Sequence, residues 1–375
     1  MEGTLKTKAA VMWEQGEPWS IEEIELDPPL SHEVLIRIVA SGLCHSDDHI
    51  RTGDLQIQTP VIGGHEGAGI IEEVGSAVTG LAVGDHVVLS FVPACGRCEW
   101  CSTGRQNLCD LGQFLMQGTM IEDGGYRAHA RGQDLGAMSL LGTFAGHAVV
   151  HESSVVKIPD DVPLDKACLV GCGVTTGWGS AVHIGKVSAG ETVVVVGAGG
   201  LGVNAIQGAR LAGAQRIIAV DPVEFKREQA RTFGATHTAH TTGRAQAMLT
   251  ELTAGRMADV AILTVGVARA EMVAELTALI SKAGRAVITS VSPWDVAEVE
   301  LPLQEFTLYQ KQLLGNVFGG GNPFADIPHL ISLYQTGHLL LDELVTTVYK
   351  LDDVNQGYQD LADGKNIRGV IIHDH

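Results

Sequence analysis

Three short segments, far apart in the sequence, carry side chains that could hold a metal ion. GLCHSDDH contains Cys44, GGHEGAG contains His65 and Glu66, and VGCGVTTG contains Cys172, with Cys168 just before it. Each of these residues alone is more often a packed core residue than a ligand. Together, two thiolates and one imidazole would fill three positions of a tetrahedral zinc site and leave the fourth open to water or a hydroxyl group. The segments therefore predict an open zinc site if the fold brings them together.

Four further cysteines fall within fifteen residues of one another. Their pattern is Cys95-x2-Cys98-x2-Cys101-x7-Cys109. Four thiolates complete a tetrahedral shell, so we expect a structural zinc ion with no position left for substrate. An iron–sulfur cluster is the alternative, but the bacterial ferredoxin motif continues with x3-C-P, whereas here the gap is seven residues and Asp110 follows. The odd total of seven cysteines argues against a secreted disulfide framework.

A glycine-rich turn follows a short apolar run and precedes a helical pattern. The run TVVVVG covers 192–197, and the residues GGLGVNAIQGARLAGA have apolar side chains at helical spacing. The residues of the turn are Gly197, Gly199, Gly200, Leu201 and Gly202. Such a fingerprint binds the pyrophosphate of a dinucleotide, because glycines allow a tight turn and the helix N-terminus offers N–H groups. A turn that binds nothing is the alternative, and the flanking strand and helix argue against it.

The nucleotide expected at this turn is NAD(H) rather than NADP(H). Asp221 ends the next predicted strand, RIIAVD, nineteen positions after Gly202. A carboxylate at this place accepts hydrogen bonds from the hydroxyls of the adenosine ribose and repels a 2′-phosphate.

The predicted secondary structure that must position these residues changes near residue 175. Before it, short apolar segments between turns predict a β-rich domain, with strands at 34–40, 67–75, 84–90 and 147–158. After it, strands and helices alternate in βαβ units, which predicts a doubly wound α/β domain with a parallel sheet. We expect the residues after 318 to rejoin the first domain.

Composition and charge exclude several classes of protein. Of the 375 residues 45% are hydrophobic and 18% charged, so the chain is neither disordered nor a disulfide-stapled miniprotein. Its 44 acidic and 25 basic residues give a net charge of −19, which argues against binding to nucleic acid or anionic lipid. We expect a cytoplasmic protein, because no stretch approaches the ~18 apolar residues of a membrane span and no signal peptide is evident.

The order and spacing of six motifs resemble those of the zinc-dependent medium-chain alcohol dehydrogenases. The motifs extend over essentially the whole chain and are CHSDDH, GHEGAG, the four-cysteine lobe, GCGVTTG, GAGGLG and GKNIRG. The resemblance implies a GroES-like catalytic domain formed by 1–174 and 319–375, with a structural zinc lobe at 95–109. Residues 175–318 would form a Rossmann domain that binds NAD. It further implies two zinc ions per chain, one catalytic and one structural, and a homo-oligomer, either a dimer or a tetramer.

The resemblance also assigns the residues of the catalytic zinc site. Cys44, His65 and Cys172 resemble its three ligands. Glu66 resembles an occasional or outer ligand, and Asp47 resembles the carboxylate that orients His65.

Contacts to the nucleotide and the substrate follow from the resemblance alone. Thr176 resembles a residue beside the nicotinamide, Lys226 one beside the adenosine ribose, and Arg368 one at the pyrophosphate. Phe91 would line the substrate pocket. Relatives often carry arginine for the pyrophosphate directly after the first ligand cysteine. Here that position is His45, which holds a dinucleotide less strongly when it is neutral.

The activity that the resemblance implies is reversible hydride transfer between a primary or secondary alcohol and NAD, which gives an aldehyde or ketone. Ser46 and His49 resemble the relay that carries the alcohol proton to solvent. GTFAGHAVVHESSVVKI, DPVEFKREQA and VFGGGNP are most similar to a bacterial nicotinoprotein branch, which uses nitrosoaniline acceptors and can keep NAD(H) bound. A thiol-dependent formaldehyde dehydrogenase and a noncatalytic NAD-binding protein are further alternatives. The pattern does not identify the alcohol.

Overall fold

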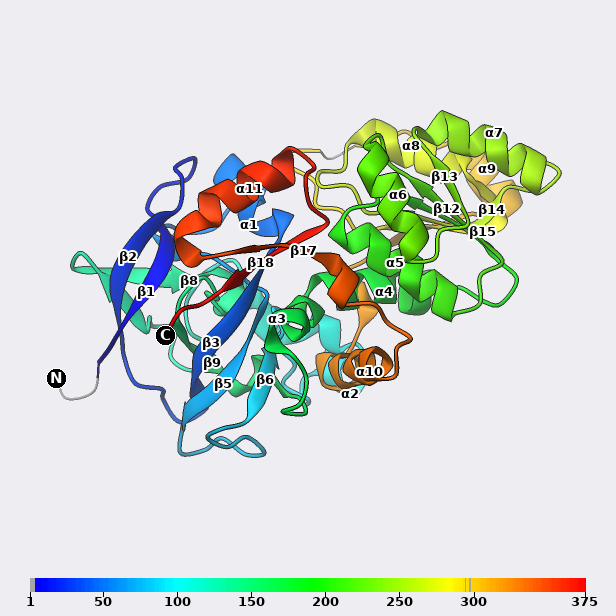
Figure 1. Cartoon of the computed structure of the whole chain (residues 1–375). Helices are drawn as coiled ribbons and strands as arrows, with labels where there is room; N and C mark the ends of the chain where they lie inside the picture. Colours follow the sequence, from blue (N-terminus) through cyan, green and yellow to red (C-terminus); the bar gives the residue numbers. More distant parts are fainter. Residues whose placement is uncertain (1–3, 294, 297) are drawn as a thin grey trace. The chain divides into compact units, whose positions relative to one another are not determined.

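The chain divides into two compact units, which are coloured along the sequence in Figure 1. Unit 1 comprises Met1–Cys172 and Asn322–His375, and unit 2 comprises Gly173–Gly321. The structure, a computed structural model, describes residues 4–293, 295–296 and 298–375.

Unit 1 is built on two β-sheets. Its strands are β1 (Leu5–Met12), β2 (Ser20–Leu26), β3 (Glu33–Leu43), β4 (Val61–Ile62), β5 (Gly67–Val74), β6 (His86–Leu89), β7 (Ala128–Ala130), β8 (Gln133–Ala137), β9 (His147–His151), β10 (Val155–Lys157), β17 (Val345–Tyr349) and β18 (Arg368–Ile372). Five of them close a barrel in the order β1-β2-β7-β8-β4. The other seven form a sheet in the order β10-β6-β5-β3-β18-β17, with β9 paired to β3. Because β18 pairs antiparallel with β3, the C-terminal segment extends a sheet of the N-terminal segment.

The helices of unit 1 are four to thirteen residues long. They are α1 (His45–Thr52), α2 (Glu99–Ser102), α3 (Leu164–Ala167), α10 (Pro323–Gln335) and α11 (Val354–Ala362). α1 and α11 lie close together in Figure 1, and Ile50 of α1 and Leu361 of α11 belong to one buried cluster with Trp19 and Phe144. This cluster supports the start of α1, where Cys44 is the N-cap residue.

One predicted strand is two strands in the structure. The segment 147–158 forms β9, a 3₁₀ turn at Glu152–Ser154, and β10. β9 pairs with β3, whereas β10 pairs with β6, so the chain changes partner at the turn. The side chain of His151 accepts the N–H of Ser153 at 3.1 Å and caps the turn. Apolar alternation on both sides of the turn hides this break from sequence analysis.

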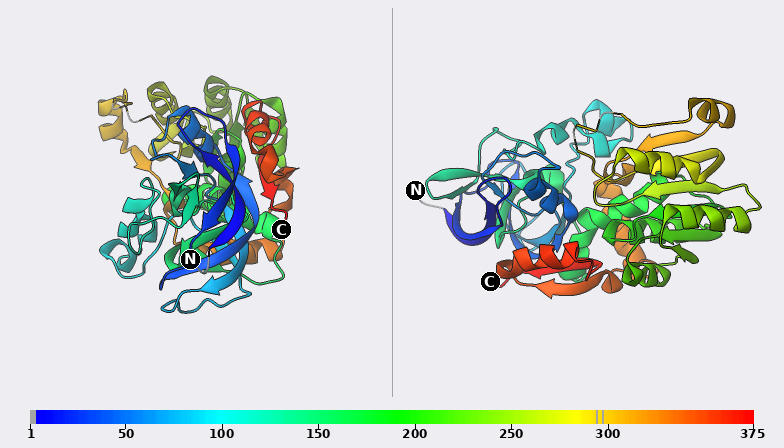
Figure 2. Two further views of the ribbon diagram at one scale, coloured as in Figure 1. Left: turned by 90° about the vertical axis from the view of Figure 1, so that its left-hand side faces the viewer. Right: turned by 90° about the horizontal axis from the view of Figure 1, so that it is seen from above.

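Unit 2 contains the predicted doubly wound parallel sheet, with its helices on either side of the strands in the right-hand view of Figure 2. Its strands are β11 (Thr192–Val196), β12 (Arg216–Val220), β13 (His237–Ala239), β14 (Ala258–Leu263), β15 (Ile280–Ile288) and β16 (Gln312–Gly315). Its helices are α4 (Gly173–Gly179), α5 (Gly200–Leu211), α6 (Glu224–Thr232), α7 (Thr242–Leu252), α8 (Ala270–Ala278) and α9 (Leu303–Tyr309), and a π-helix covers Ser180–Ile184. The order β13-β12-β11-β14-β15-β16 reverses direction between β11 and β14, which is the switch point at which such sheets bind nucleotides.

No single helix in the described part of the chain is long and apolar enough to cross a membrane. One bent pair, Leu164–Gly171 with Gly173–Ile184, reaches the required length and composition only when the two helices are taken together.

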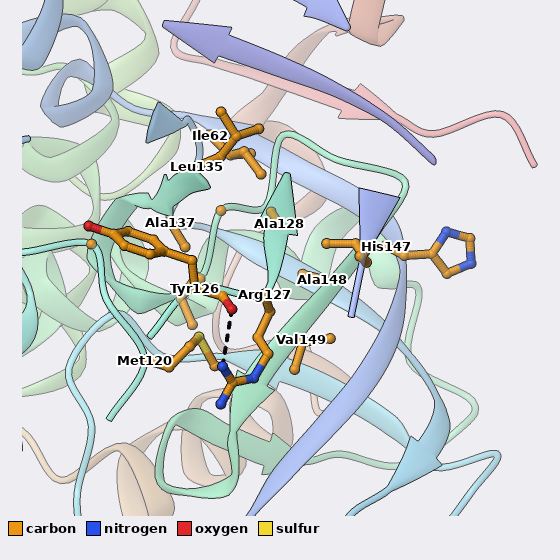
Figure 3. A pocket seen from close by; sticks show the side chains of 14 residues that line it. Ile62, Met120, Tyr126, Arg127, Ala128, Leu135, Ala137, His147, Ala148 and Val149 are labelled. Atoms are coloured by element: carbon orange, nitrogen blue, oxygen red, sulfur yellow. Dashed lines mark hydrogen bonds between the residues drawn. The ribbon is translucent and has the colours of Figure 1, made fainter. Parts of the chain in front are cut away.

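A pocket at the barrel of unit 1 is lined mainly by apolar side chains (Figure 3). At its edge, Arg127 donates to the carbonyl oxygen of Tyr126 at 3.1 Å and makes two hydrogen bonds to the buried carboxylate of Glu33, at 2.8 and 2.9 Å. A two-pronged pair of this kind holds the start of β3 against the barrel. The pocket shares no lining residue with the cysteine and histidine clusters described below.

The chain end after β18 is fixed by a buried histidine. The N–H of His373 donates to Val39 O at 3.1 Å, and its Nε2 lies 3.0 Å from the hydroxyl of Ser41. That hydroxyl donates to Thr143 O at 2.6 Å, so the ring nitrogen donates to it. Burial, and then the neighbouring His375 and His147, lower the pKa of His373 to about 3.

We expect His373 to make the protein less stable as the pH falls. The ring takes up a proton near pH 6.5 in the unfolded chain but stays neutral in the folded one, so its contribution is complete above pH 6.5 and is lost toward pH 3. His373→Gln should therefore lessen the fall in unfolding free energy between pH 7 and pH 5 by about 2 kcal/mol. Urea unfolding followed by tryptophan fluorescence measures this, with the exposed His338→Gln as control. An equal pH dependence in wild type and His373→Gln would contradict the assignment.

Candidate functional site

The structure brings together the side chains of the three separated segments within unit 1. Cys44 lies where β3 passes into α1, and His65 and Glu66 lie in the turn between β4 and β5. Cys172 follows a 3₁₀ turn at Cys168–Gly171. One ligand atom from each of Cys44, His65, Glu66 and Cys172 lies within 4.8 Å of all the others.

The chemistry of this cluster fits a divalent cation. His65 Nε2 is buried and has no hydrogen-bond partner among the described residues. A hydrogen bond from the Cys172 thiol lowers the pKa of Cys44 well below its usual range, and the same bond together with burial raises the pKa of Cys172. Two sulfurs and one imidazole nitrogen without a hydrogen-bond partner among the described residues converge here, and a zinc ion between them would supply the positive charge that thiolates attract.

Asp47 holds the His65 ring in place. His65 Nδ1 lies 3.2 Å from Asp47 Oδ1 and 3.1 Å from Oδ2, and Asp47 is fully buried. The N–H of Gly64 donates to Asp47 Oδ1 at 2.9 Å. With the proton on Nδ1, the Nε2 lone pair is free to bind a metal ion. Burial favours the neutral ring, but Asp47 and Cys44 raise the pKa of His65 well above its usual value, so the site is arranged to hold positive charge.

Glu66 is paired with Arg368 in the interior. Arg368 donates to a carboxylate oxygen of Glu66 and, at 3.2 Å, to Leu43 O. Burial raises the pKa of Glu66, while Arg368 opposes that rise. Arg368 is only 4% exposed, so its guanidinium balances a carboxylate beside the cluster. Gly42 makes room for the pair, since a Cβ atom there would lie 2.1 Å from Glu66 Oε2.

The remaining predicted residues of unit 1 lie around the cluster. The Cys44 thiol donates to the Ser46 hydroxyl at 3.7 Å, and the His45 and His49 rings are 6.0 Å apart. Phe91 meets the His65 ring edge to face at 5.8 Å. The relay role of Ser46 and His49 and the substrate role of Phe91 stay predictions.

The four-cysteine lobe has the dimensions of a single tetrahedral site. Two of its sulfur pairs, Cys95 with Cys101 and Cys98 with Cys109, are 4.0 and 3.9 Å apart. A tetrahedron with Zn–S bonds of ~2.3 Å requires sulfurs ~3.8 Å apart. Backbone N–H groups point at the sulfurs, and those of Asp110 and Cys101 lower the pKa of Cys98 to about 7, which favours a thiolate ligand.

The glycine-rich turn of unit 2 needs its glycines for different reasons. Gly197 has φ +96°, a left-handed conformation, and a Cβ atom there would lie 2.9 Å from the Thr264 backbone. A Cβ atom at Gly202 would lie 1.8 Å from Gly197 O, so only glycine lets α5 pack on β11. Around Gly199 there is open space, which allows a ligand to approach the backbone. Gly200 and Leu201 form the first turn of α5.

Asp221 lies beside this turn at the end of β12. Its Oδ2 accepts the N–H of Ala198 and its Oδ1 accepts the N–H of Val223, both at 2.9 Å. Lys226 is half-buried on α6. Thr176 on α4 is buried, and its hydroxyl has no hydrogen-bond partner in the described part of the chain. The contacts of these residues with a nucleotide stay predictions.

Sequence analysis did not find two residues that shape these sites. Thr264, directly after β14, donates from Oγ1 to Gly197 O at 2.7 Å and so fixes the turn. Gly42 makes room for Glu66, as described above. A threonine after a buried strand and one glycine among 46 give no signal in the sequence.

Both units match known families. The family model "Alcohol dehydrogenase GroES-like domain" matches residues 30–160, and "Zinc-binding dehydrogenase" matches 200–336. An NDMA-dependent alcohol dehydrogenase from Amycolatopsis methanolica is 53% identical over 369 residues, which cover 98% of this chain and 99% of that protein. Alcohol dehydrogenase B from Mycobacterium tuberculosis is 51% identical over 368 residues, 98% of each chain. Benzyl alcohol dehydrogenase from Acinetobacter calcoaceticus has a similar structure, with a TM-score of 0.91 and 32% identity over 99% of this chain and 100% of that one.

We expect the four-cysteine lobe to lose its metal and unit 1 to lose stability when one sulfur is removed. Cys98→Ser should lower the zinc content by one ion per chain and the melting temperature by about 5 °C or more, because binding energy at a closed site is folding energy. Elemental analysis and thermal melting measure both effects. Ser102→Ala, at an exposed position of the same helix, should change neither. An unchanged zinc content in Cys98→Ser would show that this cysteine is not a ligand.

Proposed function

The chain belongs to the zinc-binding alcohol dehydrogenase family, and we propose that it transfers hydride reversibly between a primary or secondary alcohol and NAD. The product would be an aldehyde or a ketone. The observation that carries this proposal is the convergence of Cys44, His65 and Cys172, which leaves one coordination position for substrate. When bound, zinc would act as a Lewis acid toward an alcohol hydroxyl, and the nicotinamide would accept the hydride.

The residues of unit 1 would hold the metal and move the proton. Cys44, His65 and Cys172 bind the ion, and Asp47 keeps the imidazole aimed at it. The Ser46 hydroxyl, next to Cys44, takes the alcohol proton, and His49 passes it toward solvent. Glu66 would bind the ion only if it left its partner Arg368, so it is an outer residue while that pair is closed.

The residues of unit 2 would bind the nucleotide. The N-terminus of α5 and the open backbone at Gly199 suit a pyrophosphate. Asp221 keeps lone pairs free for the ribose hydroxyls, and its charge disfavours a 2′-phosphate, which supports NAD over NADP. Thr176 would lie beside the nicotinamide and Lys226 beside the ribose, while Arg368 would reach the pyrophosphate only by sharing its charge with Glu66.

A second candidate function is that of a nicotinoprotein, in which NAD(H) stays bound and an external acceptor removes the electrons. The 53% identity to an NDMA-dependent alcohol dehydrogenase favours it. Two measurements separate the candidates. Denatured protein of a nicotinoprotein releases about one nicotinamide nucleotide per chain, and that enzyme reduces NDMA without added NAD. A protein that exchanges its cofactor releases little and requires added NAD.

We expect Cys172→Ser to remove the catalytic metal while the fold is kept. The zinc content should fall by one ion per chain and turnover of an alcohol panel by at least about a hundredfold, since oxygen is a poorer zinc ligand than sulfur at a site of this type. Metal analysis, circular dichroism and steady-state kinetics measure the three properties. Cys168→Ser is the matched control, because this buried thiol lies four positions earlier and donates to Asp165 O at 3.5 Å. Full turnover by Cys172→Ser would overturn the proposed site.

A further inference from the structure

Hydrogen bonds join three polar side chains, the polar cluster of Ser180, Thr289 and Asn316, in unit 2. Thr289 directly follows β15, Asn316 directly follows β16, and Ser180 begins the π-helix after α4. Asn316 Nδ2 donates to the Ser180 hydroxyl at 2.7 Å and to the Thr289 hydroxyl at 3.2 Å, and the two hydroxyls are 3.0 Å apart. The Ser180 hydroxyl donates to Thr176 O at 2.6 Å. The polar cluster therefore ties the ends of two strands to α4.

The donors of the polar cluster fix the orientation of the Asn316 amide. Because the one hydrogen of the Ser180 hydroxyl is used toward Thr176 O, Ser180 Oγ has to accept from its other neighbours. The amide of Asn316 thus turns its nitrogen toward the two hydroxyls and its Oδ1 away from them. This Oδ1 is buried and has no hydrogen-bond partner among the described residues. The polar cluster therefore presents one fixed atom that can only accept a hydrogen bond.

The free acceptor lies at the edge of the sheet that carries the glycine-rich turn. β11, β14, β15 and β16 run parallel, so Gly197, Thr289 and Asn316, which follow three of these strands, lie at the same edge. β12, with Asp221 at its end, lies on one side of β11, and β14, β15 and β16 lie on the other. With the adenosine ribose at Asp221 and the pyrophosphate at the glycine-rich turn, the nicotinamide half of NAD would extend toward Thr289 and Asn316.

The turn after Asn316 has an unusual backbone. Phe318, Gly319 and Gly320 have φ values of +54°, +66° and +68°, and a left-handed conformation is rare for an aromatic residue. A Cβ atom at Gly179 would lie 2.4 Å from Gly319 O, so this turn packs backbone to backbone against α4. Strained backbone of this kind concentrates at ligand sites, where the surrounding structure holds it in place.

We propose that Asn316 is a specificity-determining residue whose Oδ1 accepts an N–H of the nicotinamide carboxamide. The inference rests on the proposed function and names the group of the nucleotide that this end of the sheet recognises. A carboxamide nitrogen carries two hydrogens, whereas a methyl ketone at the same place on the ring offers no donor. A nucleotide with the ketone would leave the buried Oδ1 unpaired, which disfavours its binding.

Competition between two nucleotides tests the inference without any assay of turnover. The protein is dialysed to equilibrium against equal concentrations of NAD and 3-acetylpyridine adenine dinucleotide, in which a methyl ketone replaces the carboxamide. The bound nucleotides are then released by denaturation and separated by chromatography. We expect the wild type to hold about tenfold more NAD than analogue, and Asn316→Ala to hold less than about threefold more. Gln312→Ala, an exposed amide at the opposite end of β16, is the matched control and should keep the wild-type ratio.

A second variant tests the polar cluster apart from the acceptor. Ser180→Ala keeps Asn316 but removes one of the two hydroxyls that orient its amide, so the ratio should fall about threefold. This variant decides the question where Asn316→Ala does not fold or binds neither nucleotide, and an unchanged ratio in it would show that the cluster does not orient the amide.

The outcomes distinguish this inference from the proposed function. A wild type that holds both nucleotides equally would overturn the inference alone, and so would the wild-type ratio in Asn316→Ala. A wild type that binds neither nucleotide would overturn the proposed function and this inference with it.

Discussion

The crowding of two thiols and an imidazole in the interior is the constraint on which unit 1 depends. Electron-rich atoms of Cys44, His65 and Cys172 lie within 4.8 Å of one another, with His65 and Cys172 buried and Cys44 partly buried. Such an arrangement is unfavourable unless positive charge is present between the atoms. In the protein alone, the hydrogen bond from the Cys172 thiol, which lowers the pKa of Cys44, and the raised pKa of His65 partly meet this need. The surroundings therefore have to be rigid, since any relaxation would separate the ligands.

That rigidity comes from close backbone packing and from buried charges that balance in pairs. Gly42 and Gly64 lie so close to neighbouring groups that a methyl group at either would collide with them. Arg368 neutralises Glu66, and Asp47 faces His65, so the carboxylates nearest the sulfurs do not add unbalanced negative charge. The strands that carry these residues come from both ends of unit 1, because β18 is paired to β3. The metal cluster and the union of the two chain ends are therefore parts of one packing arrangement.

Sequence analysis predicted the family and the fold class, and both are confirmed by the family models and by the order of the parallel strands. Fixed short spacings made this possible, since cysteine intervals and a glycine turn between strand and helix are local signals. Contacts between residues far apart in the sequence could not be predicted. Glu66 and Arg368 are 302 positions apart, and no local pattern predicts that one neutralises the other. The break within 147–158 was missed because both halves are apolar and extended, and only their partners differ.

The position of Asp221 has a consequence for how a ligand would be recognised. Each of its oxygens is already anchored by a main-chain N–H group, and one of these groups belongs to Ala198 inside the glycine-rich turn. The carboxylate is thus held in one orientation before any ligand binds, and little conformational freedom is left to be lost on association. It also links the residues that would meet a sugar to those that would meet a diphosphate. A ligand that displaces Asp221 at its sugar would also shift the turn that meets its diphosphate. The sugar and the diphosphate of the ligand would therefore be recognised together.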